Sequence, residues 1–351
     1  RMPQAAARVR AVRTRELTRC AMSDLLAGID PRGHAIADAA DTALLGALEI
    51  AEREEAARWG NPRARVAFIA MGRYGGRECS YASDADVIAV HEAVGDATPA
   101  DAAASATTIV NRAKKLLGSA TSQLGLAVDL GLRPEGKNGP MSRTVESHRE
   151  YARRWGSTWE RQAAVRARPI GDTPLARRAG QLFEEIAYGD VSPADLRDIR
   201  LLKARMENER LPRGIEPSRH VKLGPGGLTD VEWTIQLIQM RHGRITPNLR
   251  TPSTTGAIAA AAREGLVEPS DADTLLDAWD MATRIRAANV LATGRMSGVK
   301  LDVLPRDSNE LRALAAILGY GSGGLNALEE DWLRAGRKAR DVMERLFWEQ
   351  Q

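Results

Sequence analysis

Three short apolar segments between residues 65 and 130 set the strongest limit on what this chain can fold into. They cover residues 66–71, 86–90 and 126–130, and each has the length and apolar composition of a buried β-strand. Between the second and third segments, apolar residues recur at helical spacing from 106 to 117. The order strand, turn, strand, helix, strand predicts a compact α/β unit.

Helical patterns dominate the rest of the sequence. Apolar residues recur at helical spacing before residue 60, and no strand pattern returns after about residue 172. We therefore expect an α+β fold with a helical segment at 1–60, a catalytic domain with a small mixed β-sheet at 61–172, and an all-helical bundle at 173–351.

One helix of this bundle has a predicted start and stop. Thr229 and Glu232 match the capping-box pattern, which predicts a helix over residues 230–241. Gly243 is placed to end that helix. Glu232 is accordingly interpreted as a capping residue rather than as a catalytic base.

Charge and composition narrow the classes of function. The net charge of +4 suits a polyanionic ligand such as ATP or a nucleic acid, but three Phe and five Tyr offer few rings for stacking bases. No apolar run is long enough to cross a bilayer, and the basic N-terminal stretch lacks the apolar core of a signal peptide. Cys20 and Cys79 fit neither a disulfide framework nor a metal site, so we expect a reducing, cytoplasmic setting.

A glycine-rich turn followed by two aspartates marks the candidate site. Gly72, Gly75 and Gly76 follow the first predicted strand, and glycine lets the backbone approach a ligand closely because no Cβ intervenes. Backbone amides in such a turn can bind phosphate. Asp84 and Asp86 open the second strand, where residues two apart face the same side. Two carboxylates on one face are ligands that Mg²⁺ accepts together with waters and substrate phosphates.

A third carboxylate, Asp129, lies in the middle of the third predicted strand. A charge inside an apolar strand needs a partner or a metal ion to offset its loss of hydration. If this strand pairs beside the strand of Asp86, the three carboxylates converge into a two-metal site for phosphoryl transfer. Two simpler explanations stay open. Asp-x-Asp pairs are common on protein surfaces, and Asp129 could form a structural salt bridge with Arg133.

The sequence around the turn resembles a known family. Residues 72–78 read Gly-Arg-Tyr-Gly-Gly-Arg-Glu, and residues 81–86 read Tyr-Ala-Ser-Asp-Ala-Asp. They resemble the nucleotidyltransferase motif of the DNA polymerase β-like superfamily and, more narrowly, that of the glutamine synthetase adenylyltransferases. Further segments resemble blocks of the same family at residues 128–139, 159–168 and 222–232.

The resemblance implies a magnesium-dependent enzyme that moves AMP from ATP to a tyrosine of glutamine synthetase and releases pyrophosphate. Asp84 and Asp86 would hold two Mg²⁺ ions, while Asp129 would hold the catalytic ion and help to deprotonate the tyrosine. The turn at 72–76 and Ser83 would bind the phosphates. The family also implies two regulators, a PII-type nitrogen-signalling protein and glutamine.

Two cations are further candidates for nucleotide binding. Arg133 follows the third aspartate, and Lys222 precedes a glycine-rich bend. The ammonium group of Lys222 could reach the ATP phosphates as a point charge, and a structural role for this residue is an equal alternative.

The family enzymes have two similar halves, one that attaches AMP to glutamine synthetase and one that removes it by phosphorolysis. Tyr81, Thr158-Trp159-Glu160 and Thr229-Asp230 resemble the attaching, C-terminal half. Asp230 and Glu232 would also place negative charge at the start of a helix and so discourage free phosphate there.

Three other functions stay open. They are phosphorolytic removal of AMP, nucleotidyl transfer to another substrate such as RNA, and a non-catalytic binding module that keeps the fold. The last should lack one of the carboxylates, but all three are present. Gly131 departs from the family pattern, which usually carries a charged or polar residue at this position.

Overall fold

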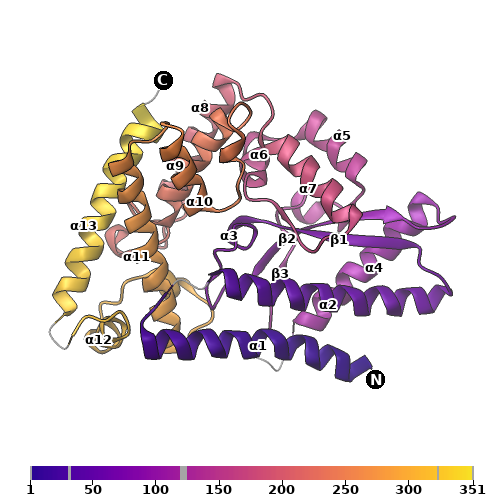
Figure 1. Cartoon of the computed structure of the whole chain (residues 1–351), viewed down its shortest axis with the longest axis horizontal. Helices are drawn as coiled ribbons and strands as arrows, with labels where there is room; N and C mark the ends of the chain where they lie inside the picture. Colours follow the sequence, from indigo (N-terminus) through magenta and orange to yellow (C-terminus); the bar gives the residue numbers. More distant parts are fainter. Residues whose placement is uncertain (1, 31–32, 119–124, 322–323, 350–351) are drawn as a thin grey trace. The chain divides into compact units, whose positions relative to one another are not determined.

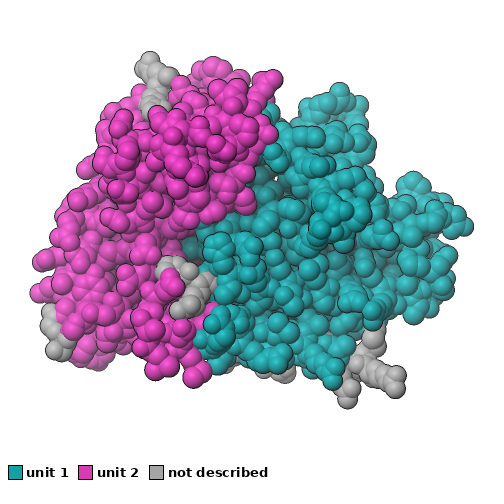
Figure 2. Space-filling model, viewed as in Figure 1, with its two compact units in different colours: residues 1–19, 33–79, 83–189 teal, residues 20–32, 80–82, 190–351 magenta. Residues whose placement is uncertain are grey.

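The computed structural model describes residues 2–30, 33–118, 125–321 and 324–349. Its contacts divide the chain into two compact units (Figure 1, Figure 2). Unit 1 contains residues 1–19, 33–79 and 83–189, and unit 2 contains residues 20–32, 80–82 and 190–351. Most of the N-terminal helical segment thus groups with the sheet. The domain boundaries expected at residues 60 and 172 stay predictions, since the limits of the two compact units fall elsewhere.

A small mixed sheet forms the centre of unit 1, as predicted. Its strands follow the order β3-β2-β1-β5, and β4 also pairs with β2. The pairs β1–β2 and β1–β5 are antiparallel, whereas β3 and β4 each run parallel to β2. The strands are β1 (Ala64–Ala70), β2 (Ala85–Ala93), β3 (Val128–Asp129), β4 (Ser142–Arg143) and β5 (Arg168–Pro169).

The first two strands are buried because their sequences are almost wholly apolar. In β1 every residue except Arg65 is buried, and β2 is buried from Val87 to His91. Both correspond to the first two apolar segments of the sequence. The third is much shorter than expected, because only Val128 and Asp129 pair with β2.

Helices cover both faces of the sheet in unit 1 (Figure 1). On one side, α4 contacts β1 and β2 and packs against α2. On the other, α7 contacts β1, β2 and β5 and packs with α5 and α6. The apolar stripe of α4 is buried as its spacing predicted. The helices of unit 1 with these roles are α2 (Gly33–Trp59), α4 (Pro99–Leu117), α5 (Val145–Trp155), α6 (Thr158–Ala164) and α7 (Pro174–Ala187).

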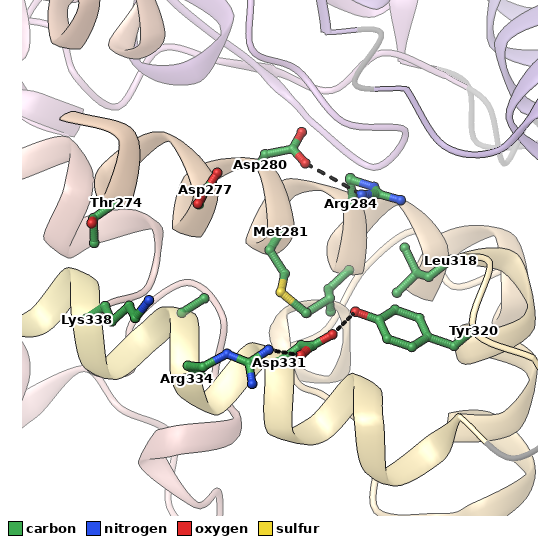
Figure 3. Close-up of a pocket in the computed structure, with 12 residues that line it drawn as sticks. Thr274, Asp277, Asp280, Met281, Arg284, Leu318, Tyr320, Asp331, Arg334 and Lys338 are labelled. Carbon is green, nitrogen blue, oxygen red and sulfur yellow. Dashed lines mark hydrogen bonds and ion pairs between the residues drawn. The ribbon is translucent and has the colours of Figure 1, made fainter. Parts of the chain in front are cut away.

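Unit 2 is helical, which confirms the predicted bundle. The only strand-like pairing in its described residues is an isolated bridge between His220 and Val303. A cavity of about 320 Å³ opens between α11 and α13 (Figure 3). The α-helices between residues 190 and 349 are α8 (Pro193–Glu209), α9 (Leu228–His242), α10 (Thr254–Arg263), α11 (Pro269–Thr293), α12 (Ser308–Ile317) and α13 (Leu325–Met343). The N-terminal helix, α1 (Met2–Ala27), begins in unit 1 and ends in unit 2. No helix in the described part of the chain is long and apolar enough to span a bilayer.

The predicted start of α9 is wrong. The helix begins at Leu228 with Gly227 as its N-cap, so Thr229 lies inside the first turn. The Thr229 hydroxyl donates to the Lys222 carbonyl oxygen at 2.7 Å instead of capping the helix. It is Asp230 that reaches back, because its Oδ2 accepts the Gly226 amide at 2.8 Å. The predicted stop is confirmed, since Gly243 is the C-cap.

Candidate active site

The three predicted carboxylates converge at one end of the sheet in unit 1. Asp129 pairs with Asp86 across the parallel β2–β3 ladder, and Asp84 comes directly before β2. Each offers one carboxylate oxygen such that all three oxygens lie within 4.8 Å of one another. Asp84 and Asp129 are exposed, and Asp86 is half-buried. The condition that the sequence left open, pairing of the Asp129 strand beside the Asp86 strand, is therefore met.

This donor set fits a divalent cation with hard-oxygen preference. Mg²⁺ binds oxygens at about 2.0–2.1 Å, so two ligands on opposite sides of one ion are about 4.2 Å apart. Three carboxylates within 4.8 Å of one another need only small side-chain rotations to reach that spacing. The exposure of Asp84 and Asp129 leaves room for waters and substrate phosphates.

Asp129 is held by its own loop and not by Arg133. The Gly131 amide donates to Asp129 Oδ1 at 2.7 Å. A Cβ at position 131 would lie 3.0 Å from the same oxygen, so glycine leaves this carboxylate uncrowded. The sequence had marked Gly131 only as a departure from the family pattern.

Arg133 stabilises the loop that follows β3. Its guanidinium donates to three backbone carbonyl oxygens, those of Leu130 at 2.8 Å, Lys137 at 3.1 Å and Gly139 at 3.2 Å. The alternative of an Asp129–Arg133 salt bridge is not seen among the ion pairs of the described residues. Contact of Arg133 with a nucleotide stays a prediction.

The glycine-rich turn is a single helical turn, α3 (Gly72–Gly75). Gly72 has a positive φ of 54°, which favours glycine. A Cβ at this position would lie 3.2 Å from Asp86 Oδ2. Gly72 thus forms one wall of the carboxylate cluster, and its contact with a nucleotide stays a prediction.

The other two glycines serve packing and the turn itself. A Cβ at Gly75 would lie 1.8 Å from the Arg166 carbonyl oxygen, so backbone packing alone demands glycine there. The Gly75 and Gly76 amides donate to the carbonyl oxygens of Met71 and Gly72 at 2.8 and 3.1 Å. These amides are engaged within the turn, and their contact with phosphate stays a prediction.

Two arginines that the sequence did not single out hold this turn. Arg166 is 2% exposed; it donates to the Gly72 carbonyl oxygen at 3.2 Å and pairs with Glu78 at 2.6 Å. Arg168 donates to the Gly75 carbonyl oxygen at 3.1 Å. It also forms a two-pronged pair with Asp41 at 2.7 and 3.0 Å. Burial lowers the pKa of Arg168, but Asp41, with smaller effects from Tyr74 and Cys79, raises it above its usual value, so the guanidinium stays charged. Residues 159–168 resemble a block of the family, but that resemblance assigned no role to either arginine. No local sequence pattern indicates partners so distant in the chain.

Comparison with known proteins decides the family. Residues 2–182, just over half of the chain, match the family described as Glutamate-ammonia ligase adenylyltransferase. The chain belongs to this family. Residues 200–348, which fall in unit 2, match the family described as GlnD PII-uridylyltransferase.

Similar proteins carry the name bifunctional glutamine synthetase adenylyltransferase/adenylyl-removing enzyme. One from Streptomyces coelicolor is 42% identical over 98% of this chain and 36% of its own length. One from Cutibacterium acnes is 41% identical over 99% of this chain and 34% of its own length. The chain thus spans about a third of the length of these adenylyltransferase relatives.

Ser83 and Tyr81, from the family motif, have different settings. Ser83 is half-buried and directly precedes Asp84. In unit 2, the Tyr81 hydroxyl donates to Asp24 Oδ2 at 2.6 Å, and both side chains are buried. Tyr81, which resembles the attaching half of the family enzymes, therefore has a structural partner.

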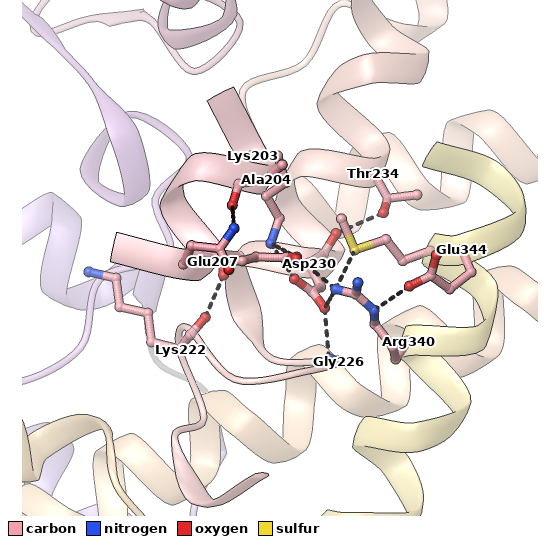
Figure 4. Close-up of polar contacts among 12 residues, drawn as sticks. Lys203, Ala204, Glu207, Lys222, Gly226, Asp230, Thr234, Arg340 and Glu344 are labelled. Atoms are coloured by element: carbon pink, nitrogen blue, oxygen red, sulfur yellow. Dashed lines mark hydrogen bonds and ion pairs between the residues drawn. The ribbon is translucent and has the colours of Figure 1, made fainter. Parts of the chain in front are cut away.

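Lys222 lies on the bend before α9 in unit 2. Its side chain is half-buried and makes no hydrogen bond or ion pair with any residue that the structure describes. Figure 4 shows it pointing away from the neighbouring ionic cluster. An ammonium group without a protein partner is suited to a ligand phosphate, but the structure does not test this role.

The cluster beside Lys222 corrects the interpretation of Asp230 as a source of negative charge (Figure 4). Asp230 is 1% exposed, and its carboxylate accepts from Lys203 at 2.5 Å and from Arg340 at 3.1 Å. Glu207 also pairs with both cations. Because Asp230 is buried and paired, it cannot repel a free phosphate as the sequence suggested.

Proposed function

We propose that this chain transfers AMP from ATP to a tyrosine of glutamine synthetase, releases pyrophosphate and so down-regulates nitrogen assimilation. We further propose that it corresponds to the C-terminal, adenylylating half of the longer bifunctional enzymes. The observation that carries the proposal is the convergence of Asp84, Asp86 and Asp129 within 4.8 Å in a member of this family.

The proposed reaction exchanges one bond at the α-phosphorus of ATP. The tyrosine oxygen attacks the α-phosphorus of ATP, the bond from that phosphorus to the bridging oxygen breaks, and the electron pair leaves with pyrophosphate. Asp84 and Asp86 would hold two Mg²⁺ ions, and Asp129 would share one of them and accept the tyrosine proton. Bound Mg²⁺ neutralises phosphate charge and favours the deprotonated hydroxyl. The exposure of Asp84 and Asp129 lets a protein side chain reach the site.

The remaining contacts concern the phosphates. Gly72 borders Asp86 and keeps the wall of the site free of a side chain. We assign the turn at 72–76, Ser83, Arg133 and Lys222 to the nucleotide. Of the two cations, Lys222 has no partner in the described chain, whereas Arg133 is engaged with its own loop.

The location and regulation proposed for the enzyme are based on its family. We propose a cytoplasmic enzyme regulated by a PII-type nitrogen-signalling protein, with glutamine as an effector. The match of residues 200–348 to the GlnD PII-uridylyltransferase family supports a link to PII. The described helices include none that could span a membrane.

The test compares two carboxylate variants of unit 1. Asp86→Asn should lower AMP transfer from labelled ATP to unmodified glutamine synthetase by about 10²–10³-fold, the size of effect seen when one electrostatic group of an active site is lost. Asp96→Asn, an exposed carboxylate beyond β2, is the matched control and should transfer normally. Near-normal turnover by Asp86→Asn at saturating Mg²⁺ would contradict the site assignment.

The second candidate function is phosphorolytic removal of AMP, because the similar proteins are named for both activities. Both reactions use the same carboxylates, so the assay must separate the directions. AMP-modified glutamine synthetase with phosphate should yield little ADP. Fast phosphate-dependent ADP release without ATP-dependent modification would assign the chain to removal.

A further inference from the structure

The position of Asp129 depends on the loop that follows it. Asp129 is exposed and is the second of the two residues of β3. While β1 occupies one edge of β2, both β3 and β4 pair along the other edge. Residues 130–141 therefore form a loop that leaves this edge and returns to it. Because β3 is so short, the contacts of this loop must help to fix the Asp129 carboxylate.

The loop is well ordered internally but incompletely packed on the sheet. Arg133 holds three of its carbonyl oxygens, and a short 3-10 helix covers Gly136–Asn138. Leu132 and Pro134 line a cavity of about 40 Å³ together with Ile88 of β2. Protein interiors contain few voids of this kind. Apolar packing alone therefore does not hold the loop against β2.

Glu135 supplies polar contacts between this loop and the rest of unit 1. Its backbone is in the left-handed region with a φ of 63°, where a side chain carries a steric cost that glycine avoids. Its carboxylate accepts from the Arg143 guanidinium at 2.7 Å. Its backbone also hydrogen-bonds to the Tyr151 hydroxyl. The side chain thus contributes an ion pair that glycine could not provide at this strained position.

The partners of Glu135 are themselves held in place. Arg143 lies on β4, its backbone pairs with β2, and its side chain is only 18% exposed. The Arg143 guanidinium carbon lies 5.4 Å from the centre of the Tyr151 ring. The Tyr151 hydroxyl donates to Glu160 of α6 at 3.1 Å. Glu135 therefore connects the loop to β4, α5 and α6.

We propose that Glu135 is a positioning residue for Asp129. Its ion pair with Arg143 holds the loop of residues 130–141 on β4 and so keeps the Asp129 carboxylate beside Asp84 and Asp86. This inference rests on the proposed role of the three carboxylates as metal ligands. Glu135 itself would touch neither metal nor nucleotide.

The experiment measures the affinity of the 351-residue chain for Mn²⁺ by electron paramagnetic resonance of the free ion. Mn²⁺ shares the oxygen ligands that Mg²⁺ prefers. Asp129→Asn removes a proposed ligand, so its weaker binding identifies the site. Glu135→Gln and Glu135→Gly should each weaken Mn²⁺ binding about tenfold, the lower end of the effect of losing groups that orient metal ligands.

Two further readouts separate positioning from general stability. In Glu135→Gly the melting temperature should stay near that of the unmodified chain, because relief of the strained backbone offsets the lost ion pair. The double variant of Glu135→Gln with Arg143→Gln should lose no more Mn²⁺ affinity than Glu135→Gln alone, since one ion pair acts as a unit. Glu146→Gln is the matched control, because Glu146 is an exposed residue of α5 that pairs with Arg149 at 2.8 Å and should bind Mn²⁺ normally.

The outcomes distinguish this inference from the proposed function. Unchanged Mn²⁺ affinity in both Glu135 variants, with weaker binding in Asp129→Asn, would overturn the inference alone. Additive losses in the double variant, an equal loss in Glu146→Gln, or a melting temperature that falls along with the affinity in both Glu135 variants would overturn it as well. Unchanged Mn²⁺ affinity in Asp129→Asn would instead overturn the metal assignment, and the inference with it.

Discussion

Asp230 offers the sharpest test of how unit 2 is stabilised. Its side chain is 1% exposed and accepts three hydrogen bonds, from Lys203 at 2.5 Å, Gly226 at 2.8 Å and Arg340 at 3.1 Å. Asp230→Asn keeps the size but removes the charge. It also turns one acceptor oxygen into an amide donor that must face either Lys203 or the Gly226–Arg340 side.

The expected cost follows from the partners that remain. Breaking a buried ion pair typically costs about 3–5 kcal/mol because an uncompensated charge stays behind. Lys203 is 1% exposed and keeps Glu207 at 2.8 Å. Arg340 keeps Glu207 and Glu344, both at 2.7 Å. Since each cation retains a carboxylate, we expect the lower end, a loss of about 3 kcal/mol in the free energy of unfolding.

The assay combines urea unfolding followed by circular dichroism with hydrogen exchange. Hydrogen exchange is needed because the chain has two compact units, which can unfold in separate transitions. The Gly226 amide and the first turn of α9 should exchange faster in Asp230→Asn. Asp198→Asn, an exposed carboxylate of α8, is the matched control and should stay within about 0.5 kcal/mol of the unmodified chain. A change below that size in Asp230→Asn, with normal exchange at Gly226, would refute the reasoning.

Three further predictions concern unit 1. Asp129→Asn should reduce AMP transfer by about 10²–10³-fold while ATP binding, measured by calorimetry, persists; a lowered melting temperature with proportionate residual activity would instead indicate a structural role. Gly75→Ala places a Cβ 1.8 Å from the Arg166 carbonyl oxygen and should cost about 1–3 kcal/mol of stability in urea unfolding, whereas an unchanged midpoint would contradict the packing. Burial lowers the pKa of His148 from 6.5 to about 4. As the pH falls, the unfolded chain therefore protonates this histidine before the folded chain does. The contribution of neutral His148 to the free energy of unfolding is intact above about pH 6.5 and is lost by about pH 4, a decrease of about 3 kcal/mol. In paired urea titrations His148→Gln should lack this component, and identical pH profiles would exclude it.

The sequence identified β1, β2 and the three carboxylates because these signals are local, whereas the two-residue strands β4 and β5 were not predicted. Apolar runs ended by glycine or aspartate predict strands wherever they occur, and β1 and β2 follow them closely. Whether Asp129 would meet Asp86 depended on which strands become neighbours, and a single sequence does not encode that choice locally. The parallel pairing of these two residues supplied the missing condition.

Long-range contacts explain what the sequence could not indicate. Arg166 and Arg168 bind a turn more than ninety positions earlier in the chain, and no spacing rule connects such residues. The start of α9 was wrong for a related reason. The pattern from Thr229 to Glu232 matched a capping box, but the glycine-rich bend before it fixes the backbone earlier, at Gly227.

The direction of the reaction now depends on fewer features than the sequence suggested. Asp230 gives no support to it, because its carboxylate is buried and paired with Lys203 and Arg340 rather than exposed to a ligand. The two directions still differ physically in their nucleophile. A tyrosine hydroxyl is neutral and inorganic phosphate is an anion, but the Mg²⁺ ions that the three carboxylates would hold offset the carboxylate charge toward either nucleophile. Of the two cations assigned to the nucleotide, Arg133 donates to three carbonyl oxygens of its own loop. Neither the carboxylates nor Arg133 therefore selects a direction, and the paired measurements of AMP incorporation and phosphate-dependent ADP release distinguish attachment from removal.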